Sequence, residues 1–153
     1  MTSNVRPLRE LVPDSLWFVT TRTVEGRLFL LPIHEVNQIV GFHLARALRK
    51  FPAIELIALI GLSNHLHLAL RDGGSQLSAF CQYLFGNIAV DINSLLGRSG
   101  PLFPRPFSAE RILDLEALAD RIRYTVLNPA AARLVDRYED WPGILITPWI
   151  FSS

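Results

Sequence analysis

The sequence IELIALIGLSNHLHLALR, residues 54–71, predicts a β-hairpin. Residues 54–62 form a nearly continuous apolar run, which is too short for a typical amphipathic helix and is consistent with a strand covered on both faces. A Ser-Asn pair then provides a tight break. Over residues 65–71 the leucines alternate with the other side chains, and successive side chains of a strand point to opposite faces. His65 and His67 are therefore expected on one face of the second strand.

The segments on either side of this hairpin predict one strand and one helix before it and two helices and a strand after it. The expected elements are a strand at 16–23, a helix that follows Pro32 and ends near Lys50, a helix capped by Ser75 that runs to about Leu96, a strand at Phe107–Leu113, and a helix over 115–127 that Asp114 caps and Pro129 stops. This order predicts an α+β fold, a ferredoxin-like sandwich whose antiparallel sheet carries its helices on one face. From about Val135 onward, Trp141 and the residues around it predict an irregular tail packed by aromatics.

The size and composition favour a single domain over residues 1–153, because 153 residues of which 50% are hydrophobic can form one core. Cys81 is the only cysteine, which excludes an intramolecular disulfide and a multi-cysteine zinc site. The first fifteen residues match no signal peptide, and no uncharged run is long enough to span a bilayer. We therefore expect a reduced, cytoplasmic protein with no membrane partner. The net charge of +1 gives only weak support to a nucleic-acid partner.

The pair His65 and His67 is the most informative short pattern in the chain. Two imidazoles on one face of a strand lie close enough to share a divalent cation. His-x-His also occurs often by chance, and two polar residues on an exposed strand face are the alternative.

The last predicted helix carries a tyrosine outside its apolar stripe. Tyr124 falls on the side opposite Leu118, Ile122 and Val126, and Asn128 lies one turn later on the side of Tyr124. A phenol activated near a bound cation can attack a phosphodiester, and an amide oxygen can serve a metal. The alternative is an ordinary, partly exposed aromatic residue on an amphipathic helix.

Three segments of the chain, in order and separation, resemble the single-tyrosine Y1/REP-associated transposases, which are HUH nucleases. GLSNHLHLAL, residues 61–70, resembles their Asn-His-hydrophobic-His strand. RYTVLNPAAARLV, residues 123–135, is similar to their Tyr-Ile-x-x-Asn-Pro-x-x-x-x-Leu-Val segment, and GPLF, residues 100–103, to their Gly-x-Leu-Phe loop. The likeness covers about residues 15–142.

This resemblance implies a ferredoxin-like HUH nuclease that acts on single-stranded DNA with a hairpin or palindromic repeat. His65, His67 and Asn128 would hold Mg²⁺ or Mn²⁺, and Tyr124 would form a 5′-phosphotyrosine link. We also expect Arg98 and Arg105 to contact nucleic acid. Related insertion-sequence transposases form dimers, which leaves a homodimer open for this chain. The basic run that usually follows the Gly-x-Leu-Phe loop is replaced here by Arg-Pro-Phe-Ser, residues 105–108, which removes DNA-binding charge.

Two other functions remain open at this stage. The chain could be a non-catalytic or domesticated nucleic-acid-binding module that stacks bases on sheet aromatics such as Trp17 and Phe18. It could also be a metal-dependent phosphoesterase that uses a metal-bound water in place of Tyr124 and leaves no covalent adduct.

Overall fold

A computed structural model describes residues 14–103, 106–131, 136–137 and 140–147 of the chain. In chain order the elements are β1 (Ser15–Arg22), the 3₁₀ turn η1 (Val24–Gly26), α2 (His34–Lys50), β2 (Ile54–Leu62), β3 (His65–Asp72), α3 (Leu77–Leu96), β4 (Ser108–Ile112), α4 (Leu115–Ala131) and β5 (Leu145–Ile146). β2 begins and ends at the predicted residues, β3 ends one residue later than predicted, and β1 and β4 each differ from the predicted bounds by one residue at both ends. No helix in the described part of the chain is long and apolar enough to cross a membrane.

The strands form one antiparallel sheet in the order β4-β1-β3-β2-β5. The hairpin strand β3 lies at the centre and pairs with β1 on one side and β2 on the other. Four strands in this order, joined by α2 and α3, make the predicted ferredoxin-like α+β fold. The fold class is therefore confirmed.

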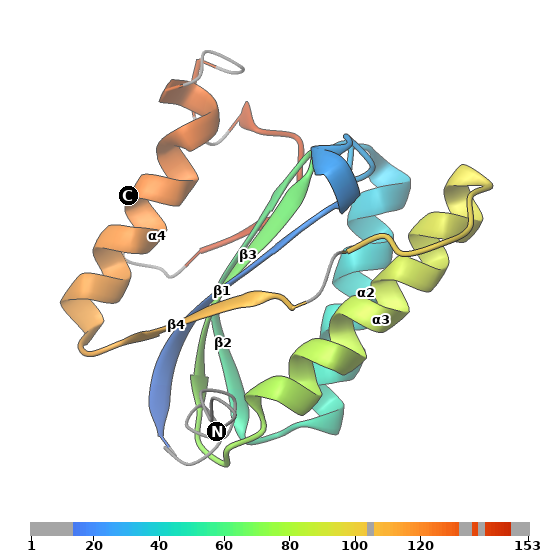
Figure 1. Cartoon of the computed structure of the whole chain (residues 1–153). Coiled ribbons are helices and arrows are strands. Elements are labelled where there is room, and N and C mark those ends of the chain that lie inside the picture. The colour runs from blue at the N-terminus through green and yellow to red at the C-terminus, as the bar shows by residue number, and fades with distance from the viewer. Residues whose placement is uncertain (1–13, 104–105, 132–135, 138–139, 148–153) are drawn as a thin grey trace, which may run out of the picture.

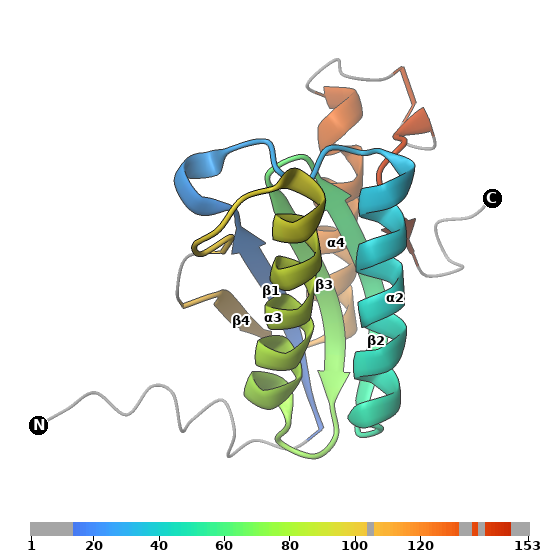
Figure 2. The same cartoon turned by 90° about the vertical axis from the view of Figure 1, so that its right-hand side faces the viewer.

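The helices cover both faces of the sheet, so the prediction that they share one face is wrong. α2 and α3 pack on one face, and α4 packs on the other (Figures 1 and 2). The physical reason is that the sheet is apolar on both sides: Phe18, Ala58 and Ile60 point away from α2 and α3 and would be exposed without α4.

Two hydrophobic cores result, one on each side of the sheet. The larger core contains Leu66, Leu68 and Leu70 of β3 together with the buried faces of α2 and α3. The smaller core contains Ala69 of β3 and the stripe Leu118, Ile122 and Val126 of α4. The alternation seen in residues 65–71 therefore divides β3 between the two cores, and the histidine face is the face that α4 covers.

The sequence predicted that Ser75 caps the start of α3, but the cap is Asp72. The Asp72 carboxylate is fully buried and accepts hydrogen bonds from the backbone N–H groups of Gly74, Gln76 and Leu77 at 2.9–3.1 Å. Ser75 has a φ of 56° and precedes the N-cap residue of α3, Gln76, whose own side chain makes no cap bond. A carboxylate is the stronger cap here because its charge interacts with the partial positive charge of the helix N-terminus.

The helix α4 starts as predicted and ends later than predicted. The Asp114 carboxylate accepts a hydrogen bond from the N–H of Ala117 at 2.8 Å, which confirms the cap. The helix continues through Pro129 to Ala131, so Pro129 does not stop it. A proline removes one hydrogen bond, to the carbonyl four residues earlier, and the final turn can remain helical without it.

The end of the described chain is more regular than the predicted irregular tail. β5 pairs with β2 at the sheet edge, and Trp141 packs in the smaller core while its Nε1–H donates to the Gly61 carbonyl at 2.8 Å. The aromatic packing was predicted, but the strand was not, because two residues give no measurable periodicity. Val135 lies outside the described residues.

Candidate active site

The two histidines lie at the start of β3, side by side with the end of β1. In the antiparallel register Thr20 lies opposite His67, and Arg22 lies opposite His65. The two imidazole rings are nearly perpendicular, with centroids 4.6 Å apart. Both side chains are partly buried on the face that α4 covers.

The ring of His65 is oriented by the residue before it. Its Nδ1 lies 2.6 Å from the Oδ1 of Asn64, and the Asn64 amide is itself held by an Nδ2–H that donates to the Gly26 carbonyl at 3.2 Å. An amide oxygen can only accept, so Nδ1 of His65 carries the proton. The neutral ring therefore keeps a lone pair on Nε2, which is the arrangement that a metal-binding histidine needs.

The ring of His67 is held by two residues of β1. Its Nδ1 lies 2.9 Å from the hydroxyl oxygen of Thr20, and its ring stacks on Phe18 with centroids 5.4 Å apart. With the proton on Nδ1, the ring donates to Thr20 and presents Nε2 to a ligand. Thr20 and Asn64 thus each orient one imidazole ring through a hydrogen bond to its Nδ1.

Both imidazoles are neutral at physiological pH. Burial, followed by the positive charge of Arg22, lowers the pKa of His65 from 6.5 to about 4. Burial again acts first on His67 and, together with the charges of His65, Arg22 and Arg121, lowers its pKa to about 3. A metal requires the neutral imidazole, and these environments keep both rings in that form.

The donor set fits a divalent transition ion that keeps open positions. Two imidazole nitrogens bind first-row transition ions more readily than Mg²⁺, and they leave coordination sites for water or phosphate oxygens. In the described part of the chain, no group of three or more His, Cys, Asp or Glu side chains could hold a metal. Within those described residues, a third protein ligand would have to be of another type, such as an amide or hydroxyl oxygen. Asn128 belongs to α4, but its side chain lies outside the described residues.

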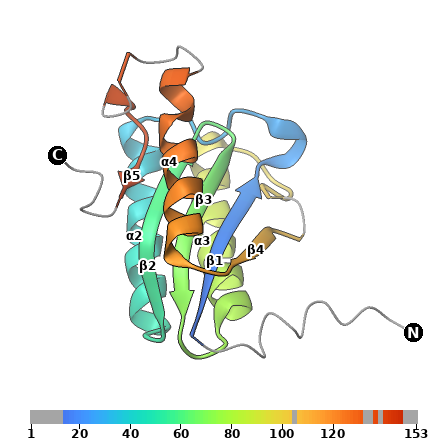
Figure 3. The same ribbon diagram turned by 90° about the vertical axis from the view of Figure 1, so that its left-hand side faces the viewer.

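Tyr124 lies on α4, away from the stripe that packs on the sheet. Its side chain is 79% exposed, as its position opposite Ile122 and Val126 predicts. The C-terminal half of α4 lies toward the end of the sheet where the β2–β3 hairpin turns (Figure 3). The hydroxyl of an exposed tyrosine at this end is accessible to a large substrate.

A series of contacts links the histidines to the helix turn that precedes Tyr124. The guanidinium of Arg121 lies 4.8 Å from the Phe18 ring and forms an ion pair with Glu110. Phe18 in turn stacks on His67. Arg121 is three residues before Tyr124, so the two side chains lie on neighbouring turns of one helix side. The sheet face that bears the imidazoles is therefore in packing contact with the helix that bears the tyrosine.

Of the two arginines predicted to contact nucleic acid, only Arg98 is described, and it lies away from the histidines. Arg98 follows α3, where its guanidinium donates to Asn93 Oδ1 at 2.7 Å and lies 4.4 Å from the ring of Phe29. Phe29 packs against the larger core, on the other side of the sheet from the histidines. Arg105 lies outside the described residues.

The two aromatic residues suggested as a stacking surface are buried. Trp17 is 5% exposed in the larger core, and Phe18 is 3% exposed beneath α4. The prediction that they offer their rings to bases is wrong, because a strand between two helical layers exposes neither face. Phe18 instead supports the ring of His67.

Sequence reasoning missed Thr20 and Arg22 as parts of this site. Together with Phe18 they alternate along β1, which is a sign that they share a face. That pattern does not say which residues of another strand lie opposite, because strand register depends on long-range packing. Only the pairing of β1 with β3 brings Arg22 to His65 and Thr20 to His67.

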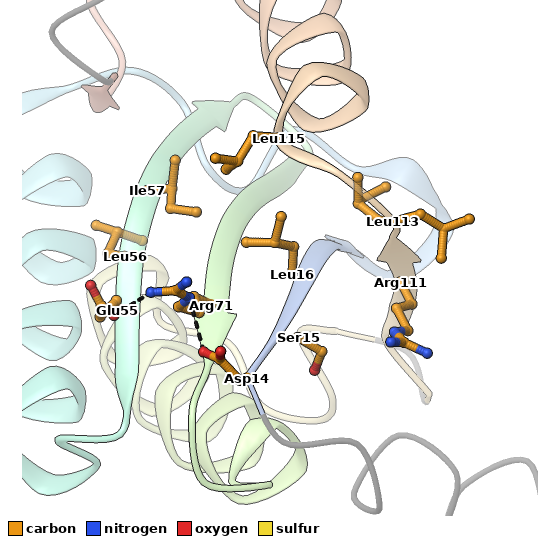
Figure 4. Close-up of a pocket in the computed structure, with 11 residues that line it drawn as sticks. Asp14, Ser15, Leu16, Glu55, Leu56, Ile57, Arg71, Arg111, Leu113 and Leu115 are labelled. Atoms are coloured by element: carbon orange, nitrogen blue, oxygen red, sulfur yellow. Dashed lines mark ion pairs between the residues drawn. The ribbon is translucent and has the colours of Figure 1, made fainter.

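A shallow cavity of about 340 Å³ lies at the other end of the strands and is separate from the histidines. It is lined by the start of β1, the start of β2 and the end of β3, with Leu115 of α4 beside it (Figure 4). Its central cation, Arg71, is paired with Asp14 at 3.1 Å and Glu55 at 3.6 Å. Its charges compensate one another, so this cavity offers no evident reactive group.

The solved structures that are similar to this chain include the following two, although no protein-family model and no curated protein matches its sequence. One is a REP-associated tyrosine transposase bound to a REP hairpin, with a TM-score of 0.70 and 20% identity over 86% of this chain and 76% of that one. The fold is shared with a transposase. The other is a protein assigned as a transposase, from Deinococcus radiodurans R1, with a TM-score of 0.51 and 16% identity over 82% of this chain and 95% of that one.

Proposed function

We propose that this protein cleaves and rejoins single-stranded DNA as a single-tyrosine, metal-dependent transposase or a close functional relative. The observation that carries the proposal is the oriented histidine pair on the sheet face that α4, with its exposed tyrosine, covers. Two neutral imidazoles and a phenol on the helix that covers their sheet face are groups that this reaction requires. The fold shared with a REP-associated tyrosine transposase supports the same function.

In the proposed reaction, Tyr124 is the nucleophile. The phenolic oxygen of Tyr124 attacks the phosphorus of a DNA phosphodiester, and the bond from phosphorus to the 3′ oxygen breaks. The phenol loses its proton to solvent, and the departing oxygen takes one up as a 3′-hydroxyl. The products are a 5′-phosphotyrosine and a 3′-hydroxyl end. Attack of a 3′-hydroxyl on the phosphotyrosine reverses the step and rejoins a strand.

His65 and His67 would hold Mg²⁺ or Mn²⁺, with Asn128 as the proposed third ligand. The ion would polarise the phosphate and neutralise charge that develops on its oxygens. Asn64 favours the tautomer of His65 that carries the proton on Nδ1, and Thr20 orients the ring of His67 through its Nδ1.

Single-stranded DNA with a hairpin is the proposed partner. The similar transposase is bound to a REP hairpin, and both proteins share a fold over most of their length. An exposed phenol on a helix surface also suits a bulky polymer substrate better than a small molecule, which usually binds in an enclosed pocket.

The test is the formation of a covalent protein–DNA adduct. The protein is incubated with Mn²⁺ or Mg²⁺ and a library of hairpin-bearing single strands, and adducts are detected on a denaturing gel. The parent protein should form an adduct that EDTA prevents. Tyr124→Phe should form none and should keep its melting temperature, because only an exposed hydroxyl is removed. Tyr83→Phe on α3 is the matched control and should behave as the parent.

Other results would identify the other functions. Cleavage by Tyr124→Phe without an adduct would make a metal-bound water the nucleophile and the protein a phosphoesterase. Tight DNA binding by the parent without cleavage of any strand would make the protein a binding module.

A further inference from the structure

In the pairing of β1 with β3, Arg22 lies directly opposite His65. Among the described residues, no other arginine of β1 or β3 faces one of the two histidines in this way. Arg22 is the last residue of β1 and the cross-strand partner of His65. Cross-strand partners point to the same face and have Cβ atoms about 5 Å apart. Arg22 therefore emerges beside the histidine pair, and its side chain is exposed to solvent.

The charge of Arg22 is not compensated by a neighbour in the described part of the chain. Arg121, the other arginine near His67, forms an ion pair with Glu110 and lies over Phe18. Arg27 is similarly paired with Glu25. No ion pair or hydrogen bond of the Arg22 side chain is present among the described residues.

An exposed guanidinium with no carboxylate partner among the described residues is available to bind an anion. The rings carry no charge that would stabilise Arg22, and Arg22 would repel a bound divalent cation. An anion that binds between the guanidinium of Arg22 and the metal is attracted to both positive charges, which offsets the repulsion between them. A phosphodiester is such an anion, and its non-bridging oxygens match the planar fork of a guanidinium.

We propose that Arg22 binds the phosphodiester that Tyr124 attacks, and so acts as a catalytic residue of this site. The assignment rests on the proposed function. Arg22 holds a non-bridging oxygen of the phosphate against the metal face of the histidine pair and stabilises the negative charge that grows there in the transition state. It makes no bond to phosphorus and transfers no proton.

The first measurement is the affinity of the DNA-free protein for Mn²⁺, by calorimetric titration. Arg22→Gln should bind Mn²⁺ about two- to tenfold more tightly than the parent, because a cation beside the metal has been removed. Arg46→Gln is the matched control, since Arg46 is an exposed arginine on α2, on the other side of the sheet. It should bind Mn²⁺ as the parent does. A purely structural role for Arg22 predicts weaker or unchanged binding.

The second measurement is the single-turnover rate of adduct formation, with protein and Mn²⁺ both saturating. Arg22→Gln should slow the rate by about 100-fold or more, and Arg22→Lys should recover part of it, since charge is kept and the planar fork is lost. Arg46→Gln should change the rate by no more than about twofold. Thermal melting of each variant checks that folding is intact.

The outcomes separate this inference from the proposed function. If the parent forms an adduct and Arg22→Gln forms it at the parent's rate, Arg22 does not bind the reacting phosphate and only this inference is wrong. The inference also fails if Arg22→Gln slows the reaction but Mn²⁺ binding weakens in parallel, because Arg22 then supports the histidines. If the parent forms no adduct with any strand, the proposed function is wrong and the Arg22 assignment fails with it.

Discussion

At the scale of single residues, the site depends on two hydrogen bonds that orient two rings. Neither Thr20 nor Asn64 would bind the metal, yet each engages the Nδ1 of a histidine and leaves its Nε2 free of that contact. Residues that orient metal-binding histidines typically matter almost as much for affinity as the ligands themselves.

Thr20→Val should weaken Mn²⁺ binding by about 10- to 100-fold, because the ring of His67 loses the partner of its Nδ1 while the side-chain shape is kept. His65→Ala and His67→Ala should each weaken it further, since they delete a ligand. Calorimetric titration measures all three. Thr125→Val is the control, because the Thr125 hydroxyl donates to the Arg121 carbonyl within α4. Equal affinities for Thr20→Val and the parent would contradict the orienting role.

The low pKa values of the histidines predict how metal-free stability changes with pH. Their pKa values are about 4 and about 3 in the folded protein and 6.5 in the unfolded chain. Between these values the unfolded state binds more protons, so the histidines' contribution to the free energy of unfolding is fully present above pH 6.5 and falls as the pH falls.

In EDTA the melting temperature should therefore decrease when the pH is lowered from 7.5 to 5.5, a window above the titration of ordinary carboxylates. The double variant His65→Gln/His67→Gln should show a smaller decrease than the parent, because it has lost the two groups that resist protonation. Scanning calorimetry at both pH values makes the comparison. Identical decreases would mean that other groups produce the pH dependence.

At the scale of elements, helices α3 and α4 are each capped by an aspartate, and one of these aspartates is buried while the other is exposed. Asp72 is fully buried and satisfies three backbone N–H groups at the start of α3, whereas Asp114 is exposed and satisfies one at the start of α4. Buried unsatisfied donors are costly, so the two caps should differ in their contribution to stability.

Asp72→Ala should lower the free energy of unfolding by about 2 kcal/mol or more, and Asp114→Ala by about 1 kcal/mol. Urea denaturation measures both. The larger loss is expected at Asp72 because its removal leaves three donors without a partner inside the protein. A larger loss at Asp114 would show that α4, and not α3, limits the stability of the fold.

At the scale of the whole molecule, the near balance of positive and negative side chains limits how DNA can be bound. The net charge is +1, and several arginines are already paired with carboxylates, among them Arg71, Arg121 and Arg27. Affinity for DNA should therefore depend on a few phosphate contacts and on recognition of shape, not on a broad basic surface.

Binding of hairpin DNA should show a shallow salt dependence, with a slope of log affinity against log salt equivalent to about two or three released counterions. Arg105→Ala should weaken binding modestly and reduce the slope by about one. Fluorescence anisotropy at several salt concentrations measures both quantities. A slope that corresponds to many counterions would reveal a basic groove that the composition hides.

The sequence alone determined the parts of this protein that depend on local periodicity. The bounds of β2, the two faces of β3, the exposure of Tyr124 and the cap at Asp114 all follow from side-chain alternation or helical spacing within a few residues. These features were predictable because each depends on neighbours that are close in the chain. The histidine pair belongs to this group, since two residues of one strand two positions apart always share a face.

The tertiary structure decided everything that depends on which segments meet. An apolar stripe on α4 says that one helix side is buried, but not against which face of the sheet, and β1 does not disclose its register with β3. The cap at Asp72 was missed for a related reason, because its carboxylate reaches over a turn to donors two, four and five residues ahead. Arg22 could be assigned to the site only because its pairing partner on the neighbouring strand is His65. Register and layer order are set by the joint burial of residues far apart in the chain, which no local pattern contains.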